Sequence, residues 1–453
     1  MNSFISIVTL RKIYLSLILS ALPFTYIFAQ SEKLYSKDEI IQDIDFLVQD
    51  LETIHPNLYH SISREVFYKK VKDVKDQIPD SISKIDIWRK MNEILPLIKE
   101  GHTYIRPPER SIGDFLRFPF RIKIDIKAKE FIITGSPVDT LKKYTGERIV
   151  SINGISVDSL IEIFYNNTSA ENDALLIFMN EKHIDYALYS VFGSPEYFYI
   201  NLLVADKKVK LRCKSIKHIQ DKAVPVFTFE MIHENIGLID MNRLSSLKKF
   251  EKFCKKTFRY LNKNNIENLI IDFRGNGGGD SKVGDELIKY LSNVPFTQYQ
   301  KAIIKVSSAS KQQFHYHQEE GTLIEIELTK DKLTEPYPEK IRYSGNVFVL
   351  IDGETYSSAG STVWCINHYH LATTVGKETG GTGVHYGYPI KRKLPNSGLT
   401  YYVSHIKWYQ IGADDESTHG LIPDYETDVT IEDIKNNTDA AFNFVMKLIE
   451  QEK

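Results

Sequence analysis

Apolar side chains recur at helical spacing in the early part of the chain. Ser36 and Glu39 form a capping box, the pattern that marks the N-terminus of a helix. The apolar positions behind it fall on one helical face: Ile40, Ile41, Ile44, Leu47, Leu51 and Ile54. The His-Pro pair at 55–56 ends this helix, and two more helical runs follow within residues 67–95, each closed by a proline. We therefore expect a small helical domain over residues 31–110.

The period of the pattern changes to that of strands after residue 115. Isoleucines stand at every second position over residues 122–126 and alternate with charged residues, as in a half-buried strand. An Asn-Gly pair at 153–154 predicts a tight turn, with a short strand and a helix behind it. A further hairpin is expected within residues 197–211. Together these features predict a β-rich module with one or two helices over residues 111–220.

From residue 226 onward strands and helices alternate, which indicates an α/β domain over residues 221–453. Three apolar runs are expected to be strands and two longer runs helices: 236–239, 269–271 and 347–351, then 247–261 and 283–291. The run at 269–271 is continuously apolar, which predicts a strand buried on both faces. Residues 301–342 are expected to form an inserted hairpin or arm.

The first thirty residues differ from the rest of the chain. Basic residues at 11–12 precede an uncharged apolar run over 13–29, and polar residues follow. This order is that of a secretory signal peptide, with cleavage expected near residues 29–30. A membrane anchor is the alternative, but the run is short for a membrane span and Pro23 interrupts it. We expect residues 1–30 to be removed and the mature protein to be exported, to the periplasm or beyond, with no membrane attachment.

Charge and cysteine content narrow the function classes. The 453 residues include 57 Lys plus Arg against 59 Asp plus Glu, so no basic excess argues for a nucleic-acid partner. Cys213, Cys254 and Cys365 have no metal-ligand spacing and are too few for a disulfide framework. We expect them to be buried as small apolar residues, and we expect neither a metal nor a cofactor.

A glycine-rich turn follows the strand predicted at 269–271, in the run IDFRGNGGGD (271–280). Glycines permit positive φ and close approach of the backbone, so free N–H groups there can bind a developing oxyanion. A phosphate-binding P-loop is excluded, because no Lys followed by Ser or Thr comes after the glycines, and the spacing is not GxGxxG. A plain flexible turn stays open as the alternative.

A serine turn follows the last of the predicted strands, in the run DGETYSSAGS (352–361). Ser357 would stand exposed between that strand and a helix starting about Ala359, a position suited to a nucleophile. The alternative is a helix N-cap without a chemical role. Ser358 or Ser361 could take the cap while Ser357 reacts, and the Ser358 N–H could then face a tetrahedral intermediate.

Two further runs hold groups that a nucleophilic serine requires. His102, in KEGHTYI (99–105), lies in a turn after the helical domain and is a candidate general base. Since the chain has 13 His, a surface residue is the alternative interpretation. The acidic run GADDESTHGLIPDYE (412–426) offers carboxylates that could orient the imidazole, although a solvated loop is the simpler interpretation of each acid taken singly.

Taken in order, these runs resemble the S41 peptidases, the family of the C-terminal processing (tail-specific) proteases and the tricorn core protease. Six motifs carry the resemblance: Gly101-His102-Thr103, the 146–157 region, 272–279, 355–360, VGKETGG (375–381) and GLIPD (420–424). The likeness is closest to exported S41 proteins of Bacteroidetes-type bacteria. It implies a ClpP/crotonase-like ββα catalytic domain in the α/β part, a PDZ-like identity for the β-rich module, and the helical domain before both.

The resemblance also implies which residues carry the chemistry. One branch of the family uses a Ser/Lys dyad, and its Lys would stand where this chain has Thr382, so a Lys base is disfavoured. The tricorn-like branch uses a His that matches His102, and it has a Ser before that His where this chain has Gly101. That branch also has a Glu near the C-terminal run. Glu416 is the best match for this acid, and Asp415 is next.

The activity that the resemblance implies is that of a serine-type endopeptidase acting on peptides or unfolded protein segments. Ser357 would attack, His102 would accept its proton, and the N–H groups of Ser358 and of Gly277 or Gly278 would hold the oxyanion. The PDZ-like module would bind an extended peptide as an added strand. A catalytically inactive peptide- or apolar-ligand-binding protein on the same fold and a serine esterase are the alternatives.

Overall fold

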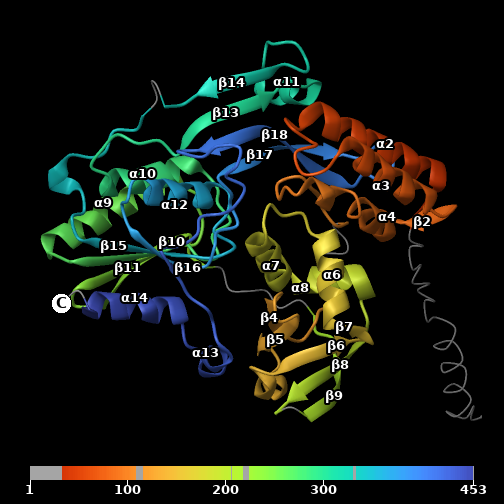
Figure 1. The fold of residues 1–453 in the computed structure, drawn as a ribbon, viewed down its shortest axis with the longest axis horizontal. Coiled ribbons are helices and arrows are strands. Elements are labelled where there is room, and N and C mark those ends of the chain that lie inside the picture. The colour runs from red at the N-terminus through yellow and green to blue at the C-terminus, as the bar shows by residue number, and fades with distance from the viewer. Residues whose placement is uncertain (1–32, 109–115, 206, 218–223, 330–332, 452–453) are drawn as a thin grey trace, which may run out of the picture. The chain divides into compact units, whose positions relative to one another are not determined.

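The computed structural model describes residues 33–108, 116–205, 207–217, 224–329 and 333–451 (Figure 1). The predicted signal peptide at 1–30 lies outside these residues. Among the described residues, no helix combines the length and the apolar character needed to cross a membrane. The fold is mixed α/β, as expected, and each region is built as follows.

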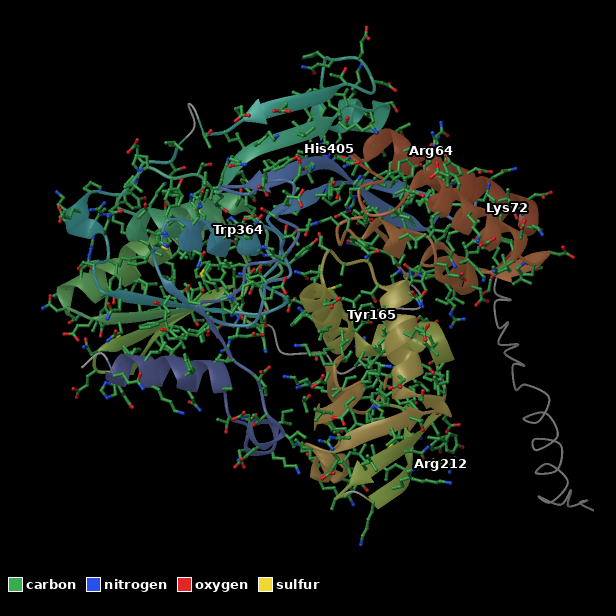
Figure 2. The ribbon with its side chains drawn as sticks, viewed as in Figure 1. Arg64, Lys72, Tyr165, Arg212, Trp364 and His405 are labelled. Atoms are coloured by element: carbon green, nitrogen blue, oxygen red, sulfur yellow. The ribbon has the colours of Figure 1, made fainter. Side chains whose placement is uncertain are left out.

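The early region is helical, with one short strand pair. Its elements are β1 (Leu34–Ser36), α2 (Lys37–Ile54), α3 (Arg64–Asp76), β2 (Ser81–Ser83), α4 (Lys84–Met91) and the 3-10 helix η1 (Leu95–Ile98). The Ser36–Glu39 capping box starts α2, and His55 caps its end, so this prediction is confirmed. The outer face of α3 carries the exposed residues Arg64 and Lys72 (Figure 2).

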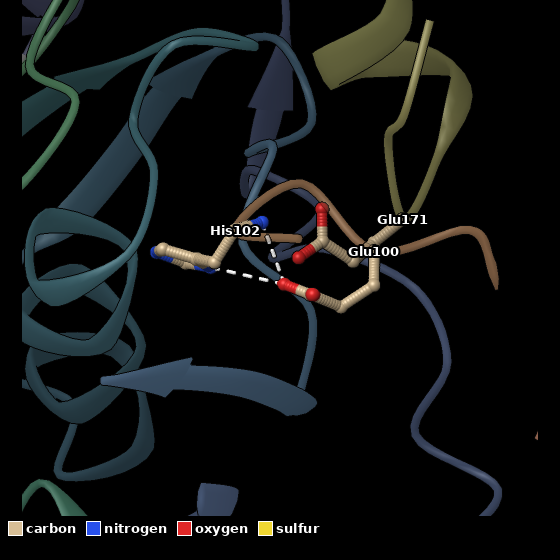
Figure 3. A group of neighbouring side chains, drawn as sticks. All are labelled: Glu100, His102 and Glu171. Carbon is tan, nitrogen blue, oxygen red and sulfur yellow. Dashed lines mark hydrogen bonds and ion pairs between the residues drawn. The ribbon is translucent and has the colours of Figure 1, made fainter. Parts of the chain in front are cut away.

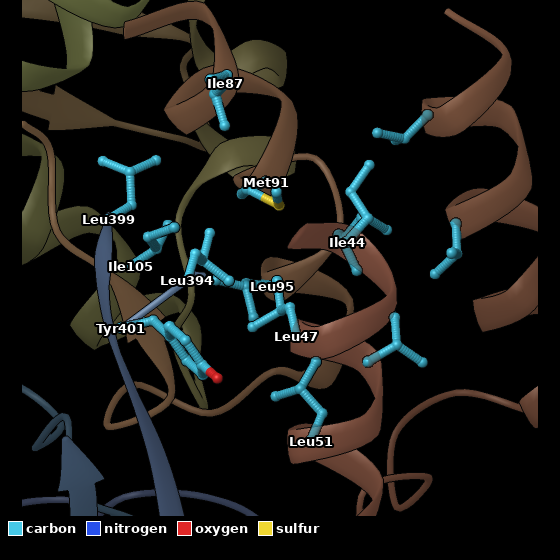
Figure 4. Packing of buried hydrophobic residues seen from close by; sticks show 14 of the residues in the cluster. Ile44, Leu47, Leu51, Ile87, Met91, Leu95, Ile105, Leu394, Leu399 and Tyr401 are labelled. Carbon is cyan, nitrogen blue, oxygen red and sulfur yellow. The ribbon is translucent and has the colours of Figure 1, made fainter. Parts of the chain in front are cut away.

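The helices of this region complete their core with a hairpin from the far end of the sequence. The two strands are β17 (Val384–Lys393) and β18 (Thr400–Gln410). Leu399 and Tyr401 pack with Leu47 and other residues of α2 (Figure 4). Buried Asp50 of α2 accepts a hydrogen bond from Arg392 Nε at 2.7 Å and another from the Tyr401 hydroxyl. The hairpin is thus fixed to α2 by both apolar and polar contacts.

The β-rich region forms an antiparallel sheet in the order β4-β5-β6-β8-β9. Its elements are β4 (Arg121–Asp125), β5 (Glu130–Gly135), η2 (Asp139–Tyr144), β6 (Arg148–Ile152), β7 (Ile155–Ser156), α6 (Val157–Asn167), α7 (Asp173–Lys182), α8 (Ile184–Phe192), β8 (Tyr197–Val204) and β9 (Lys207–Lys214). Asn153 and Gly154 turn with positive φ between β6 and β7, as predicted. The sequence predicted one or two helices here. The described residues form three, because α7 and α8 are separated by His183 alone.

The α/β region is built on a sheet in the order β10-β11-β12-β15-β16-β19, parallel from β11 onward. Its elements are β10 (Phe227–His233), β11 (Ile236–Met241), α9 (Leu247–Lys263), β12 (Asn268–Asp272), α10 (Ser281–Leu291), β15 (Asn346–Ile351), α12 (Ser358–His368), β16 (Thr373–Gly376), β19 (Tyr425–Glu426), α13 (Ile431–Asn436) and α14 (Ala440–Gln451). The strands and helices predicted here are confirmed.

Helices cover both faces of this parallel sheet. Leu269 and Ile271 of β12 pack in the cluster that contains α9, α10 and α12, whereas Ile270 packs in the cluster that contains Val445 of α14. All three strand residues are fully buried. The continuous apolar run is explained by this double cover, since neither face of the strand meets water.

A second sheet, in the order β14-β13-β18-β17, joins the regions. Its remaining strands lie in the predicted arm, whose elements are β13 (Tyr299–Lys305), α11 (Ser308–Phe314), β14 (Leu323–Glu327) and η3 (Glu339–Ile341). The arm is a hairpin, but β13 also pairs with β18. The short strand β3 (Tyr104–Ile105), just after His102, pairs with β18 as well. The long strand β18 therefore reaches both the early helices and the loop that carries His102.

Candidate active site

The loops after β12 and β15 form the floor of the site. The two strands are parallel neighbours, so their carboxyl ends lie at the same edge of the sheet. Hydrogen bonds tie the two loops together, from Thr355 Oγ1 to the Phe273 carbonyl at 3.1 Å and from the Gly275 N–H to Asp352 at 3.1 Å. The glycine-rich run and the serine turn, far apart in sequence, thus become one surface.

Ser357 stands at the junction between this loop and α12. Its backbone has φ 53° and ψ −131°, a conformation that L-residues seldom adopt and that stores strain at functional turns. Its side chain makes no capping hydrogen bond to α12, so the N-cap alternative is wrong for its hydroxyl. Ser358 Oγ donates to the Gly279 carbonyl at 2.9 Å, and Ser361 Oγ donates to the Ser357 carbonyl at 3.2 Å. The Ser357 hydroxyl therefore stays available for chemistry.

The glycines pack directly against Ser357. A Cβ on Gly278, which has φ 98°, would lie 2.8 Å from the Tyr356 carbonyl oxygen and 2.9 Å from Ser357 Cβ. The Gly278 N–H, one of the two candidate oxyanion donors in this loop, already donates to Asn276 Oδ1 at 2.9 Å. The N–H groups of Gly277 and Ser358 have no acceptor among the described residues. The geometry therefore favours Gly277 over Gly278 as the donor.

His102 meets Ser357 although 255 positions separate them in the chain. Its Nε2 lies 3.0 Å from Ser357 Oγ. The loop is held because β3 pairs with β18 and because Thr103 Oγ1 accepts a hydrogen bond from the Ser404 N–H at 3.1 Å. The two residues predicted to react with each other are thus brought within one hydrogen bond.

The carboxylate beside His102 belongs to Glu100, which the sequence analysis missed. Glu100 is fully buried, and its Oε1 accepts the His102 backbone N–H at 2.6 Å and lies 3.4 Å from His102 Nδ1 (Figure 3). Its Oε2 accepts a hydrogen bond from Ser404 Oγ at 3.2 Å. The signal in the sequence was an acidic residue directly before Gly101-His102. Charged residues are almost never fully buried unless they are paired, so the burial of Glu100 marks it as a partner of His102.

A second carboxylate, that of Glu171, is linked to His102 by the hydroxyl of Tyr356. Tyr356, the residue before Ser357, donates its hydroxyl hydrogen to Glu171 Oε1 at 2.6 Å, and the same oxygen lies 2.7 Å from His102 Nδ1. The Tyr356 and His102 rings stack, with centroids 4.7 Å apart. Glu171 comes from the segment between α6 and α7, so no pattern near the other motifs could have indicated it.

The acids predicted to orient His102 lie in other contacts, which corrects that assignment. Asp415 Oδ1 accepts hydrogen bonds from Lys407 Nζ and from the Tyr409 hydroxyl, both at 2.7 Å. Glu416 is exposed, and its backbone N–H donates to Asp414 in the same loop. These acidic residues are therefore engaged within their own loop or with Lys407 and Tyr409. The carboxylate next to the His102 imidazole is that of Glu100.

A lysine base has no counterpart at the described site. Thr382, at the position where the Ser/Lys branch has its Lys, is buried and donates its hydroxyl to the Val384 carbonyl at 2.6 Å. Lys377 pairs with Glu426 at 3.0 Å and with Asp428. The Nε2 of His102 is the basic atom recorded within hydrogen-bond distance of Ser357 Oγ.

The ligand-type atoms of Glu100, His102 and Glu171 lie within 4.8 Å of one another. Two carboxylates and an imidazole are a donor set that suits zinc. The same atoms are already engaged with one another and with Tyr356, so hydrogen bonds account for their positions.

Two cavities lie at the site, one lined by His102 and the other by Glu171. One cavity, of about 1100 Å³, is lined by His102, Gly277 and Tyr356 and by a mixture of apolar and polar side chains, among them Trp88, Leu175, Met179, Arg89 and Glu93. The other, of about 510 Å³, is lined by more polar residues that include Glu171, Thr382 and Lys407. A volume of about 1100 Å³ is large enough for a ligand bigger than a single side chain.

The charges around His102 favour its protonated form. Burial acts to lower the pKa of His102, but the hydrogen bond and the charge of Glu100 outweigh burial and raise that pKa above the ordinary 6.5. Burial acts to raise the pKa of Glu100, yet its contacts with His102 lower it. Burial, followed by the charge of Glu100, raises the pKa of Glu171. The site is therefore arranged to stabilise an imidazolium.

This arrangement predicts the acid side of the pH profile. Only neutral imidazole can accept the Ser357 proton, so kcat/KM is expected to rise with pH through a midpoint above 6.5. In Glu100→Gln the charge that raises the His102 pKa is gone, so the midpoint is expected to move to lower pH. Measuring kcat/KM from pH 4 to 9 in both proteins checks this, and identical midpoints would contradict the role given to Glu100.

One family model and several solved structures match this chain. Residues 235–427 match the sequence model of peptidase family S41. The resemblance to the S41 peptidases is confirmed. A search of curated proteins finds no match. The S41 match covers the sheet from β11 to β19 and includes both loops of the floor, but not the segments with His102 and Glu171.

Solved structures resemble the chain over most of its length. A structure of mature CPAF complexed with lactacystin has 14% identity and a TM-score of 0.68, covering 91% of this chain and 97% of that chain. A second structure of mature CPAF has 14% identity and a TM-score of 0.65, covering 88% and 94%. A protein from Parabacteroides merdae has 15% identity and a TM-score of 0.50, covering 91% and 96%. At these identities the similarity shows the fold, and it extends beyond residues 235–427 over most of this chain.

Proposed function

We propose that this S41 chain is an exported serine-type endopeptidase in which Ser357 is the nucleophile and His102 is the general base. The observation that carries the proposal is the 3.0 Å contact between His102 Nε2 and Ser357 Oγ, at a serine held in a strained turn. The family match supports a peptidase, and the signal-peptide pattern at 1–30 supports export.

The proposed reaction follows the geometry of the site. Ser357 Oγ attacks the carbonyl carbon of a peptide bond while its proton passes to His102 Nε2. The oxyanion accepts hydrogen bonds from the N–H groups of Gly277 and Ser358, and the buried carboxylate of Glu100 stabilises the imidazolium. Collapse breaks the C–N bond as Nε2 returns the proton to the leaving amine. Water then hydrolyses the acyl-enzyme by the same route.

The proposed substrate is an extended peptide or an unfolded protein segment. The cavity of about 1100 Å³ is lined by His102 and Gly277 together with apolar and polar side chains that an extended chain could contact. We assign the β-rich region, residues 111–220, as a PDZ-like module, and residues 221–453 as the ClpP/crotonase-like catalytic domain. An extended peptide has unpaired N–H and C=O groups that such a module binds at a sheet edge.

A fluorophosphonate probe tests the proposal. Purified protein lacking residues 1–30 is expected to be labelled at Ser357, located by mass spectrometry, and His102→Ala is expected to lose the labelling. A digest of a peptide library, compared with turnover of a simple ester, then separates a peptidase from an esterase. Absence of labelling in folded protein would favour the binding-protein alternative.

A further inference from the structure

We propose that Tyr356 and Glu171 are positioning residues that fix the tautomer and the orientation of His102. This inference deepens the proposed function, because it names the groups that keep His102 Nε2 free to accept the Ser357 proton. Glu171 lies in the loop before α7 and Tyr356 in the loop before α12, and Tyr356 links Glu171 to His102 Nδ1, the ring nitrogen that faces away from Ser357.

The direction of each hydrogen bond follows from counting hydrogens. A phenol carries one hydrogen, and burial keeps it in place by raising the pKa of Tyr356 far above its ordinary range. When Glu171 is ionised it can only accept, so Tyr356 gives that hydrogen to Glu171 Oε1 at 2.6 Å. The phenol oxygen then meets His102 Nδ1, 2.7 Å away, as an acceptor. Nδ1 therefore carries the imidazole hydrogen, and Nε2 presents its lone pair to Ser357 Oγ.

Gly101 provides the space for this arrangement. A Cβ at position 101 would lie 2.7 Å from the Tyr356 hydroxyl oxygen and 3.0 Å from Glu171 Oε2. A serine at position 101, where the tricorn-like branch has one, would therefore collide with the phenol. The Tyr356 hydroxyl occupies space that a serine side chain at position 101 would need. Glycine at this position and the phenol beside His102 therefore depend on each other.

Glu171 has a position that folding alone does not favour. Its Oε2 is buried and has no hydrogen-bond partner among the described residues. Buried polar atoms in native proteins are rarely left unsatisfied, and the exceptions gather at functional sites. A carboxylate held there through one oxygen adds negative charge near His102, and its charge acts to raise the His102 pKa.

Kinetics and spectroscopy of Tyr356→Phe and Glu171→Gln test the inference. Both variants are expected to lower kcat by about 10- to 100-fold with KM changed far less, since the groups act on the base and not on the substrate. Glu171→Gln is also expected to shift the acid midpoint of the pH profile downward. Tyr409→Phe, which removes a phenol paired with Asp415 at 2.7 Å, is the matched control and is expected to keep wild-type kinetics.

Nitrogen-15 spectra of the histidine rings measure the tautomer directly, with His102→Ala to assign the signal. In the wild type the hydrogen is expected on Nδ1, and in Tyr356→Phe a mixture of tautomers is expected. Unchanged spectra and unchanged kcat in Tyr356→Phe would overturn the inference. Because the spectra need no turnover, a protein without peptidase activity would end the proposed function and still test this one.

A double-mutant cycle with Gly101→Ser adds a second test. Gly101→Ser alone is expected to lower kcat strongly, whereas in the Tyr356→Phe background its added effect is expected to be smaller, because the colliding hydroxyl is gone. Additive effects would overturn the collision argument. A chelator arm covers the metal alternative: loss of activity with EDTA and recovery with zinc would replace the hydrogen-bond assignment with a metal site.

Discussion

Ser357→Ala is expected to lower kcat/KM by at least about 10⁴-fold while the protein stays folded. The variant removes the atom that forms the covalent intermediate, and the residual rate then depends on the oxyanion donors and substrate binding alone. Ser358→Ala is the matched control, because it removes the neighbouring hydroxyl and keeps the backbone N–H that we assign to the oxyanion. Peptide hydrolysis and probe labelling of the three proteins give the comparison. Retained turnover in Ser357→Ala would end the assignment.

The same position gives a stability result that runs against the usual order. Alanine is normally more stabilising than glycine by about 0.5–1 kcal/mol. At φ 53° and ψ −131° the strain of a side-chain-bearing residue costs about 1–3 kcal/mol, which glycine avoids. Ser357→Gly is therefore expected to unfold at a higher temperature than Ser357→Ala, although both are inactive. The reverse order in thermal unfolding would show that the turn is not strained.

Gly278→Ala is expected to reduce kcat/KM by on the order of 10²-fold, through displacement of Ser357. The new Cβ would lie 2.8 Å from a backbone oxygen and 2.9 Å from Ser357 Cβ, and the residue has φ 98°. The backbone of the serine turn must move, and small misplacements of a nucleophile have large kinetic effects. Comparing kcat/KM and thermal unfolding of the variant with those of the wild type checks both consequences.

Two alanine variants serve as comparisons for Gly278→Ala. A Cβ at Gly277 would lie 3.8 Å from its nearest neighbour, Glu354 Oε1, and the N–H would be kept, so Gly277→Ala is expected to cost much less. A Cβ at Gly135 would meet nothing within 4 Å, so Gly135→Ala is expected to be neutral. Equal losses in Gly277→Ala and Gly278→Ala would show that the loop senses any side chain, and not the contact with Ser357.

Features that depend on nearby residues, or on the order of motifs along the chain, were predicted from the sequence. The capping box fixed the start of α2, the apolar run of β12 indicated cover on both faces, and the order of the motifs placed Ser357 and His102 as partners. The boundaries of the regions were harder to predict. The early helices share their core with Leu399 and Tyr401. No local pattern, in the early helices or around residue 400, predicts that these segments pack together.

The supporting residues of the site were missed for a related reason. Glu100 is recognisable only when its burial is known, because a charged residue beside a turn is ordinarily solvated. Glu171 and Tyr356 meet through folding of the α6–α7 segment against the serine turn, 185 positions apart in sequence. Glu416 and Asp415 were chosen by position within a motif, and hydrogen bonds with Lys407 and Tyr409 engage Asp415 instead.

The pairing of β3 with β18 also bears on when the site can form. Thr103 and Ser404, which tie the His102 loop in place, are 301 positions apart, so this contact cannot exist until nearly the whole chain has left the ribosome. Contacts of such long sequence separation form slowly, because closing the intervening loop costs entropy before the contact offsets it. A growing chain that still lacks β18 therefore lacks the contacts that hold the His102 loop. Under the proposed function, the pair of Ser357 and His102 would form only after β18 has been synthesised.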